Sequence, residues 1–132
     1  MRTLFMAAAC ALGVLGTSAP VVAHHAFAAE FDRKQPITLV GKLSKVEWVN
    51  PHTWFHIDVT DSRGKVVTWR VEGAAPNQLM RRGWNRNSLK LGEQVTIEGF
   101  RARSGEPIAN GTQIKLANGT IFGAASPANS NN

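Results

Sequence analysis

Histidine is the side chain best suited to chemistry in this sequence, and its four copies fall into two groups. His24 and His25 are adjacent, whereas His52 and His56 are four residues apart. Neutral imidazole is the commonest metal ligand among protein side chains, and imidazole-rich sites suit transition metals. The histidines therefore predict a metal site, provided that the fold brings the two groups together.

The segment before His24 decides what that residue can do. Residues 4–15 are almost free of polar groups, and small residues follow at 21–23, as before the cleavage site of a secretory signal peptide. An apolar run of about 12 residues is too short to span a membrane, which takes about 20. We therefore expect residues 1–23 to be a cleaved signal peptide, the protein to be periplasmic or secreted by a bacterium, and no transmembrane segment to remain.

Cleavage behind Ala23 would make His24 the N-terminal residue. Its free amine and its imidazole could then close one chelate ring on a metal ion, which is the first half of a histidine brace. A terminal amine titrates near pH 7.7 to 8, so a metal can displace its proton near neutrality. His25 offers a competing mode, in which the amine, the intervening amide nitrogen and the His25 ring bind Cu(II) in a plane.

The brace needs one more imidazole, from His52 or His56. Four residues of a regular strand span about 13 Å, whereas a metal lies about 2.0 to 2.1 Å from an imidazole nitrogen. Both rings can bind one ion only if the chain bends between them. We favour His52, because it follows Asn50-Pro51 at the end of a predicted strand and could meet the N-terminus. His56 is expected to pair with Asp58 or to lie on the sheet surface.

The donor set also predicts the metal. Nitrogen ligands without sulfur suit Cu(II) best, with Ni(II) and Zn(II) behind it. Cys10 is the only cysteine and lies in the expected signal peptide, so the processed chain has neither a disulfide nor a thiolate ligand. The net charge of +6 is spread along the chain, which is typical of a solvated surface, and nucleic acid is not an expected partner.

The elements that would position these residues are mostly strands. Alternating apolar and polar residues on either side of a turn at 61–64 predict a hairpin. Gly41 predicts a bulge or sharp bend within a long first strand. Turn signals occur at Asn110-Gly111 and at Asn118-Gly119. The predicted strands are residues 36–49, 53–60, 65–72, 95–100 and 112–117, with a short extension at 120–122.

A short helix is expected at residues 76–83, because Pro76 stands at its start and Gly83 at its end. Three strands, a helix and two more strands match an all-β fold, a five-stranded OB-like Greek-key barrel with one helix between the third and fourth strands. The expected domain layout is an N-terminal segment at 24–36, the barrel at 37–123 and a disordered tail at 124–132.

The outer face of the second strand offers another kind of site. Trp54 lies there with His56 and Asp58, and an indole ring can line a ligand groove. Trp54 and Asp58 therefore form a candidate ligand face. Glu47 and Glu72 are expected on solvated strand faces. The sequence has no glycine-rich phosphate loop, HExxH, CxxC or serine elbow, so no catalytic residue is predicted.

Four separated motifs carry a family resemblance: HHAFAAEFD, NPHTWFHIDV, PNQLMRRGW and LKLGEQVTIEGF. With its HH-x-F start and its NPH-x-W motif, the sequence resembles an uncharacterised family of small exported bacterial proteins, a domain of unknown function, from about His24 to Phe122. The resemblance implies one small β-rich domain behind a signal peptide, with His24, His25 and His52 in recurring positions. It implies no activity, cofactor or catalytic residue.

Two functions of different kinds remain open. The first is a non-enzymatic exported protein that binds Cu(II) through His24, His25 and His52 and acts as a carrier, buffer or sensor. The alternative is an OB-type binding module that holds a small ligand, an envelope polymer or a partner protein without a metal. An oxidative copper enzyme ranks last, because no substrate groove can be identified from the sequence.

Overall fold

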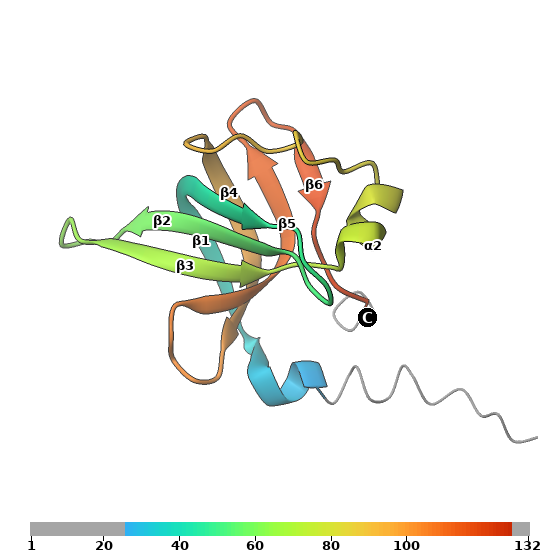
Figure 1. Ribbon diagram of the computed structural model, residues 1–132. Helices are drawn as coiled ribbons and strands as arrows, with labels where there is room; N and C mark the ends of the chain where they lie inside the picture. Colours follow the sequence, from blue (N-terminus) through green and yellow to red (C-terminus); the bar gives the residue numbers. More distant parts are fainter. Residues whose placement is uncertain (1–25, 128–132) are drawn as a thin grey trace, which may run out of the picture.

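The computed structural model describes residues 26–127, which form a sheet curled into a ring with short helices at its margins (Figure 1). Residues 26–30 are helical and lead directly into the first strand. The remaining elements are β1 (Phe31–Glu47), β2 (Trp54–Thr60), β3 (Val66–Glu72), α2 (Pro76–Arg81), β4 (Gln94–Ala102), β5 (Ile108–Leu116) and β6 (Ile121–Gly123).

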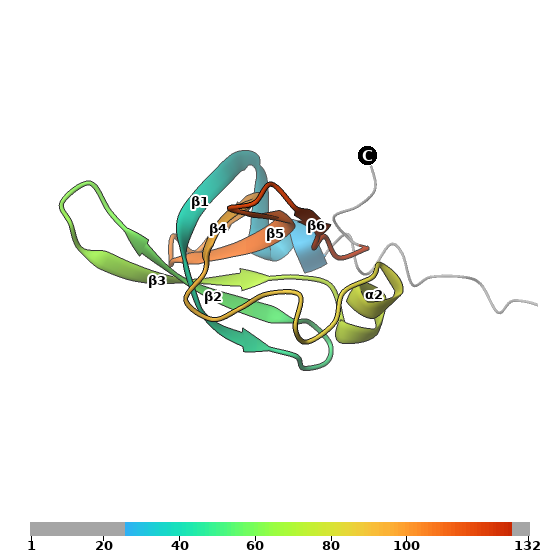
Figure 2. The same ribbon diagram turned by 90° about the horizontal axis from the view of Figure 1, so that it is seen from above.

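The strand order is β3-β2-β1-β4-β5-β6, and an additional parallel pairing of β3 with β5 closes the first five strands into a ring. β1 is long enough to pair with β4 through its first part and with β2 through its last part. Seen from above, the far end of the β2–β3 hairpin extends away from the ring (Figure 2). The predicted mainly-β, OB-like arrangement with a helix between the third and fourth strands is confirmed, and β6 adds a sixth strand.

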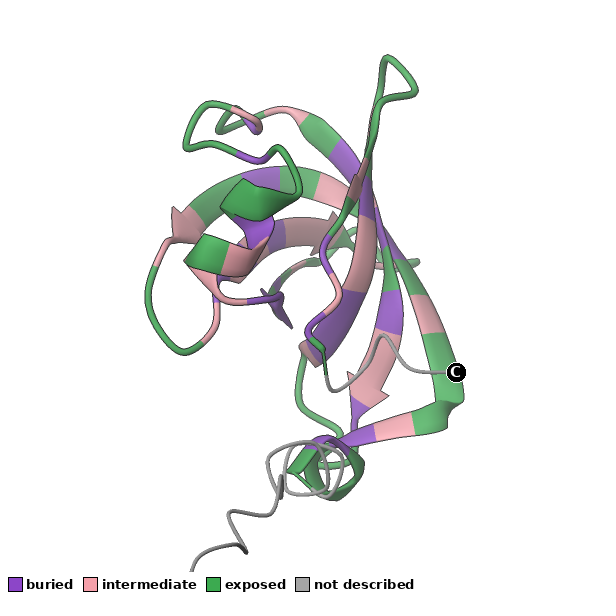
Figure 3. Cartoon of the chain, turned by 90° about the vertical axis from the view of Figure 1, so that its right-hand side faces the viewer, coloured by how far each residue is buried: buried purple, intermediate pink, exposed green. Residues whose placement is uncertain are grey.

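The core fills the inside of this ring because the strands alternate. Phe55 and Ile57 of β2 are fully buried, and they belong to one buried cluster with Val71 of β3 and Ile97 of β4. Burying one such side chain stabilises the fold by about 1.5 to 3 kcal/mol. Bands of buried residues alternate along the strands in Figure 3. The outward face of β2 carries the half-buried polar residues that the alternation predicts.

The first strand contains the predicted irregularity, but not at the glycine. The register against β2 shifts between Leu43 and Lys45. This irregularity begins two residues after Gly41. Gly41 instead marks a close approach of two backbones, because a Cβ there would lie 2.4 Å from the Asp58 carbonyl oxygen. The glycine is required for strand proximity, and the bulge forms elsewhere.

Two boundary predictions are wrong. Asn110-Gly111 is part of β5 and not a turn, since Gly111 pairs with Gly99 of β4. Asn118-Gly119 does form the predicted turn before β6, and Gly119 has a positive φ of 90°.

The second wrong boundary is the start of the first strand. It begins at Phe31 and not at the expected residue 36, because residues before 36 also pair with β4.

The segment after β6 also differs from the expected disordered tail, because Ala124 is fully buried. Its N–H donates to the Thr112 carbonyl at 2.9 Å, and its carbonyl accepts the Ala74 N–H at 2.8 Å. The Arg82 guanidinium donates to the Ala125 carbonyl at 2.7 Å. Residues 124–127 are therefore part of the packed domain, and residues 128–132 lie outside the described part.

Adding one methyl group at Gly99 should test the β4–β5 contact. A Cβ at Gly99 would lie 2.1 Å from the Asn110 carbonyl oxygen, so Gly99→Ala should lower the free energy of unfolding by about 2 kcal/mol or more. Gly123→Ala is the matched control, because nothing lies within 4 Å of its Cβ position, and it should change stability by less than about 0.5 kcal/mol. Equilibrium urea unfolding measures both, and equal effects would contradict the close approach.

Candidate functional site

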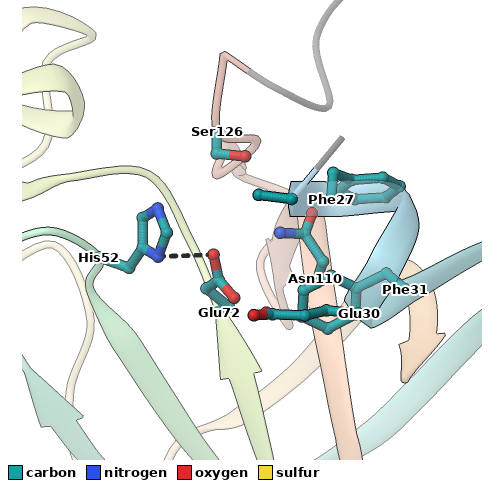
Figure 4. Close-up of a pocket in the computed structure, with 8 residues that line it drawn as sticks. Phe27, Glu30, Phe31, His52, Glu72, Asn110 and Ser126 are labelled. Carbon is teal, nitrogen blue, oxygen red and sulfur yellow. Dashed lines mark ion pairs between the residues drawn. The ribbon is translucent and has the colours of Figure 1, made fainter. Parts of the chain in front are cut away.

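His52 lies in the loop between β1 and β2, directly after the cis peptide bond Asn50-Pro51. Its Nδ1 is 2.7 Å from Oε1 of Glu72, the last residue of β3 (Figure 4). The antiparallel register pairs Trp54 with Glu72, which brings the end of β3 beside the start of β2. The His52 side chain is 39% exposed, whereas that of Glu72 is only 6% exposed.

The Glu72 contact determines which nitrogen of His52 can bind a ligand. A carboxylate accepts hydrogen bonds, so Nδ1 carries the proton and Nε2 holds the lone pair in the neutral ring. Figure 4 shows Nε2 on the edge of the ring that faces away from Glu72. Within residues 26–127, Nε2 has no hydrogen-bond partner. The contact with Glu72 therefore holds the imidazole ring through Nδ1 and leaves Nε2 available to bind a ligand.

A pocket of about 140 Å³ adjoins this pair, and we call it the His52 pocket. Glu72 lies centrally in Figure 4, between His52 and the side chains of Asn110 and Glu30. The wall opposite the β1–β2 loop comes from the helical residues that precede β1. The lining residues are Ala26, Phe27, Glu30, Phe31, His52, Glu72, Asn110 and Ser126.

Packing fixes this N-terminal helical segment against the end of the ring. Phe27 and Phe31 are buried and form a small apolar cluster with Ala102, and their ring centroids are 5.5 Å apart. Arg103 Nε donates to the Ala28 carbonyl at 2.8 Å. These contacts hold Ala26 at the His52 pocket, although it is near the start of the described chain.

The electrostatics of the pocket act on His52. The hydrogen bond to Glu72 is the largest effect and raises the pKa of His52 above its ordinary value. Partial burial opposes this change, whereas the negative charges of Glu72 and Glu30 add to it. The pocket therefore favours a positive charge at His52, although the whole chain carries a net charge of +6.

His56 belongs to a different cluster on the outer face of the sheet. Its Nε2 is 3.0 Å from Oε1 of Glu47, and the same oxygen lies 2.6 Å from the Lys45 ammonium. The Lys45 hydrogen bond is the main reason that the pKa of Glu47 is lowered. Of the two arrangements expected for His56, the position on the sheet surface is the one found. Asp58 is not its partner, because Asp58 accepts a 2.7 Å hydrogen bond from the Thr68 hydroxyl.

The other predicted site residues are not brought together. Trp54 lines a separate pocket beside the start of β1, and Asp58 lines one at the far end of the β2–β3 hairpin with Val40, Lys42 and Val66. Trp54 and Asp58 therefore face two different pockets. His24 and His25 lie outside the described residues. Within residues 26–127, no group of three His, Cys, Asp or Glu side chains could together hold a metal ion.

Glu72 is the residue that sequence reasoning placed wrongly, since it is buried and not on a solvated face. The hairpin register contained the signal. Counting outward from the turn expected at 61–64 pairs Thr60 with Lys65 and Thr53 with Glu72, one residue away from the observed pairing of Trp54 with Glu72. That count puts Glu72 beside the loop that carries His52. No sequence pattern predicts that Glu30 lines the pocket, because its position depends on how the helical segment before β1 packs against the sheet.

The comparisons with known proteins identify a family for this chain but no activity. The model of a family of unknown function, DUF6152, matches residues 11–113. The chain belongs to this family. The DUF6152 match covers the His52 loop, Glu72 and the helical segment that lines the pocket. No curated protein matches the chain significantly. Among residues 26–127, no helix is long and apolar enough to cross a membrane.

Replacing Glu72 by glutamine should lower the pKa of His52 toward its ordinary value, because the charge and the strongest hydrogen bond are then lost. A titration of the imidazole protons by NMR in metal-free protein measures this. Glu47→Gln is the matched control, since it removes the carboxylate of the other His–Glu pair and should leave the His52 titration unchanged. An unchanged His52 pKa in Glu72→Gln would show that the contact does not form in solution.

The same pair predicts a pH-dependent contribution to stability. The folded pKa of His52 is raised above 6.5, so its stabilisation is complete below about pH 6.5 and is lost as pH rises through the folded pKa. Glu72→Gln should therefore destabilise the protein more at about pH 6 than at about pH 9. Urea unfolding at the two pH values measures the difference, and a larger loss at the higher pH would contradict the assignment.

Proposed function

We propose that this protein is a small exported metal-binding protein that holds one Cu(II) ion at the His52 pocket. The ligands are His52 Nε2 together with the amine and ring of a processed N-terminal His24, or the alternative His25 arrangement. The observation that carries the proposal is that Ala26 lines the same pocket as His52. Because His24 and His25 immediately precede Ala26 in the sequence, the proposal assigns them as the ligands that complete the site at His52.

The bond between Glu72 and His52 supports the proposal. Metal-binding histidines almost always donate their second ring N–H to a carboxylate, carbonyl or water, which fixes the ring and makes the ligand nitrogen more basic. Glu72 accepts from Nδ1 at 2.7 Å, which leaves Nε2 as the ligand atom. The nearby negative charge of Glu30 adds an electrostatic preference for a cation.

The size of the pocket favours an ion over an organic substrate. Its volume is about 140 Å³, whereas pockets for small molecules usually measure about 300 to 1,000 Å³. His56 is a poor alternative ligand because its Nε2 contacts Glu47. We therefore infer a carrier, buffer or sensor and not an enzyme, with Cu(II) ahead of Ni(II) and Zn(II) for a nitrogen donor set.

A Cu(II) titration followed by calorimetry and EPR tests this function. The protein should be exported and processed by the cell, and its intact mass should show that it begins at His24. One tight site with nitrogen hyperfine structure is expected. His52→Gln should weaken binding by about 100-fold or more, and Glu72→Gln by about 10- to 100-fold. His56→Gln is the matched control and should leave the affinity unchanged.

A second variant tests the terminal amine directly. One extra residue ahead of His24 blocks the chelate without changing any described contact, so it should remove most of the affinity. Equal Cu(II) binding with and without that residue would disprove the role of the amine. Equal binding by His52→Gln, or a processed chain that begins elsewhere, would contradict the proposed ligand set.

A further inference from the structure

A second pocket, which we call the Trp54 pocket, also adjoins the N-terminal helical segment. It has a volume of about 320 Å³ and is thus within the range of small-molecule sites. It shares Glu30 and Phe31 with the His52 pocket. The lining residues are Ala29, Glu30, Phe31, Trp54, Ala102, Arg103, Ser104 and Ile108.

The wall of the Trp54 pocket is apolar and fixed in place. Phe31 and Ala102 are buried parts of one cluster, and Ile108 packs against them. The Arg70 guanidinium lies 4.6 Å from the centroid of the Trp54 ring, which restrains the indole through a cation–π contact. A ligand would therefore meet an aromatic surface that needs little further ordering, which reduces the entropy lost on binding.

The rim of the pocket is polar and carries both signs of charge. Glu30, Arg103 and Ser104 are exposed there, and they supply a carboxylate, a guanidinium and a hydroxyl group. The Arg103 guanidinium is held in place by the Ala28 carbonyl at 2.8 Å and by Asp32 at 3.7 Å. An anionic ligand would be repelled by Glu30, and a cationic one by Arg103.

We propose that the Trp54 pocket binds a neutral carbohydrate. The C–H face of a sugar ring is apolar and can pack against indole, while its hydroxyl groups donate to Glu30 and accept from Arg103 or Ser104. This site is distinct from the proposed metal site and does not depend on it.

The position of the pocket agrees with this ligand. Trp54 begins β2, and Arg103 and Ser104 belong to the β4–β5 loop. In OB folds, the face of the second and third strands, together with the loops after the first and fourth strands, binds oligosaccharides and oligonucleotides. The carboxylate of Glu30 at the rim favours a neutral sugar over a phosphate-rich nucleic acid.

The test uses processed, metal-free, ¹⁵N-labelled protein, so that failure of the metal proposal cannot affect it. Maltotetraose, cellotetraose and tetra-N-acetylchitotetraose are added while NMR follows the four indole N–H signals, with Trp54 assigned from the Trp54→Phe spectrum. At least one sugar should shift the Trp54 signal with a Kd of about 1 mM or tighter. No shift with any of them at about 10 mM would overturn the proposal.

Matched variants locate the binding without removing core residues. Ala29 lines the pocket and is exposed, so Ala29→Phe should fill it and weaken binding by about tenfold or more. Ala28 is exposed on the same helical segment but lines neither pocket, so Ala28→Phe should bind normally. Equal losses in both variants, or binding of an octathymidylate probe in place of every sugar, would overturn the assignment.

Discussion

The parallel pairing of β3 with β5 holds both pockets in place. It joins Arg70 to Ile108 and Glu72 to Asn110, and the Arg70 N–H also donates to the Pro107 carbonyl at 3.0 Å. The pairing requires small residues nearby, since a Cβ on Gly111 would lie 2.8 Å from the Val71 side chain. Because it closes the ring, it brings the last residue of β3 to the same end as the β1–β2 and β4–β5 loops.

The helical residues 26–30 complete that end of the ring from the outside. They are fixed by apolar packing of Phe27 and by the Arg103 contact to the Ala28 carbonyl, and they line both the His52 pocket and the Trp54 pocket. Glu30 lines both pockets, so the two proposed sites have this carboxylate in common. The two proposed sites thus share a wall while they differ in size and in donor chemistry.

The sequence predicted the alternating strands well, because β2 and β3 each have one buried and one outward face that depend only on local order. It predicted the fifth strand poorly, since Asn110-Gly111 has the composition of a turn while the structure uses Gly111 for a close approach to β3. The partner of His56 depends on the register shift between Leu43 and Lys45, and an irregular register cannot be read from alternation. His52 was predicted to lie in a loop after a strand, but Glu30 enters its surroundings only through tertiary packing.

The buried position of Ala124 has a consequence for the limits of the folding unit. The family match ends at residue 113, inside β5, and Ile114 immediately beyond it is fully buried. A fragment cut at that boundary would lose the end of β5, all of β6 and the two backbone hydrogen bonds that Ala124 makes with Thr112 and Ala74. Ser126 is also buried and lines the His52 pocket. The smallest fragment that keeps both the core and the pocket intact therefore extends at least to Ser126.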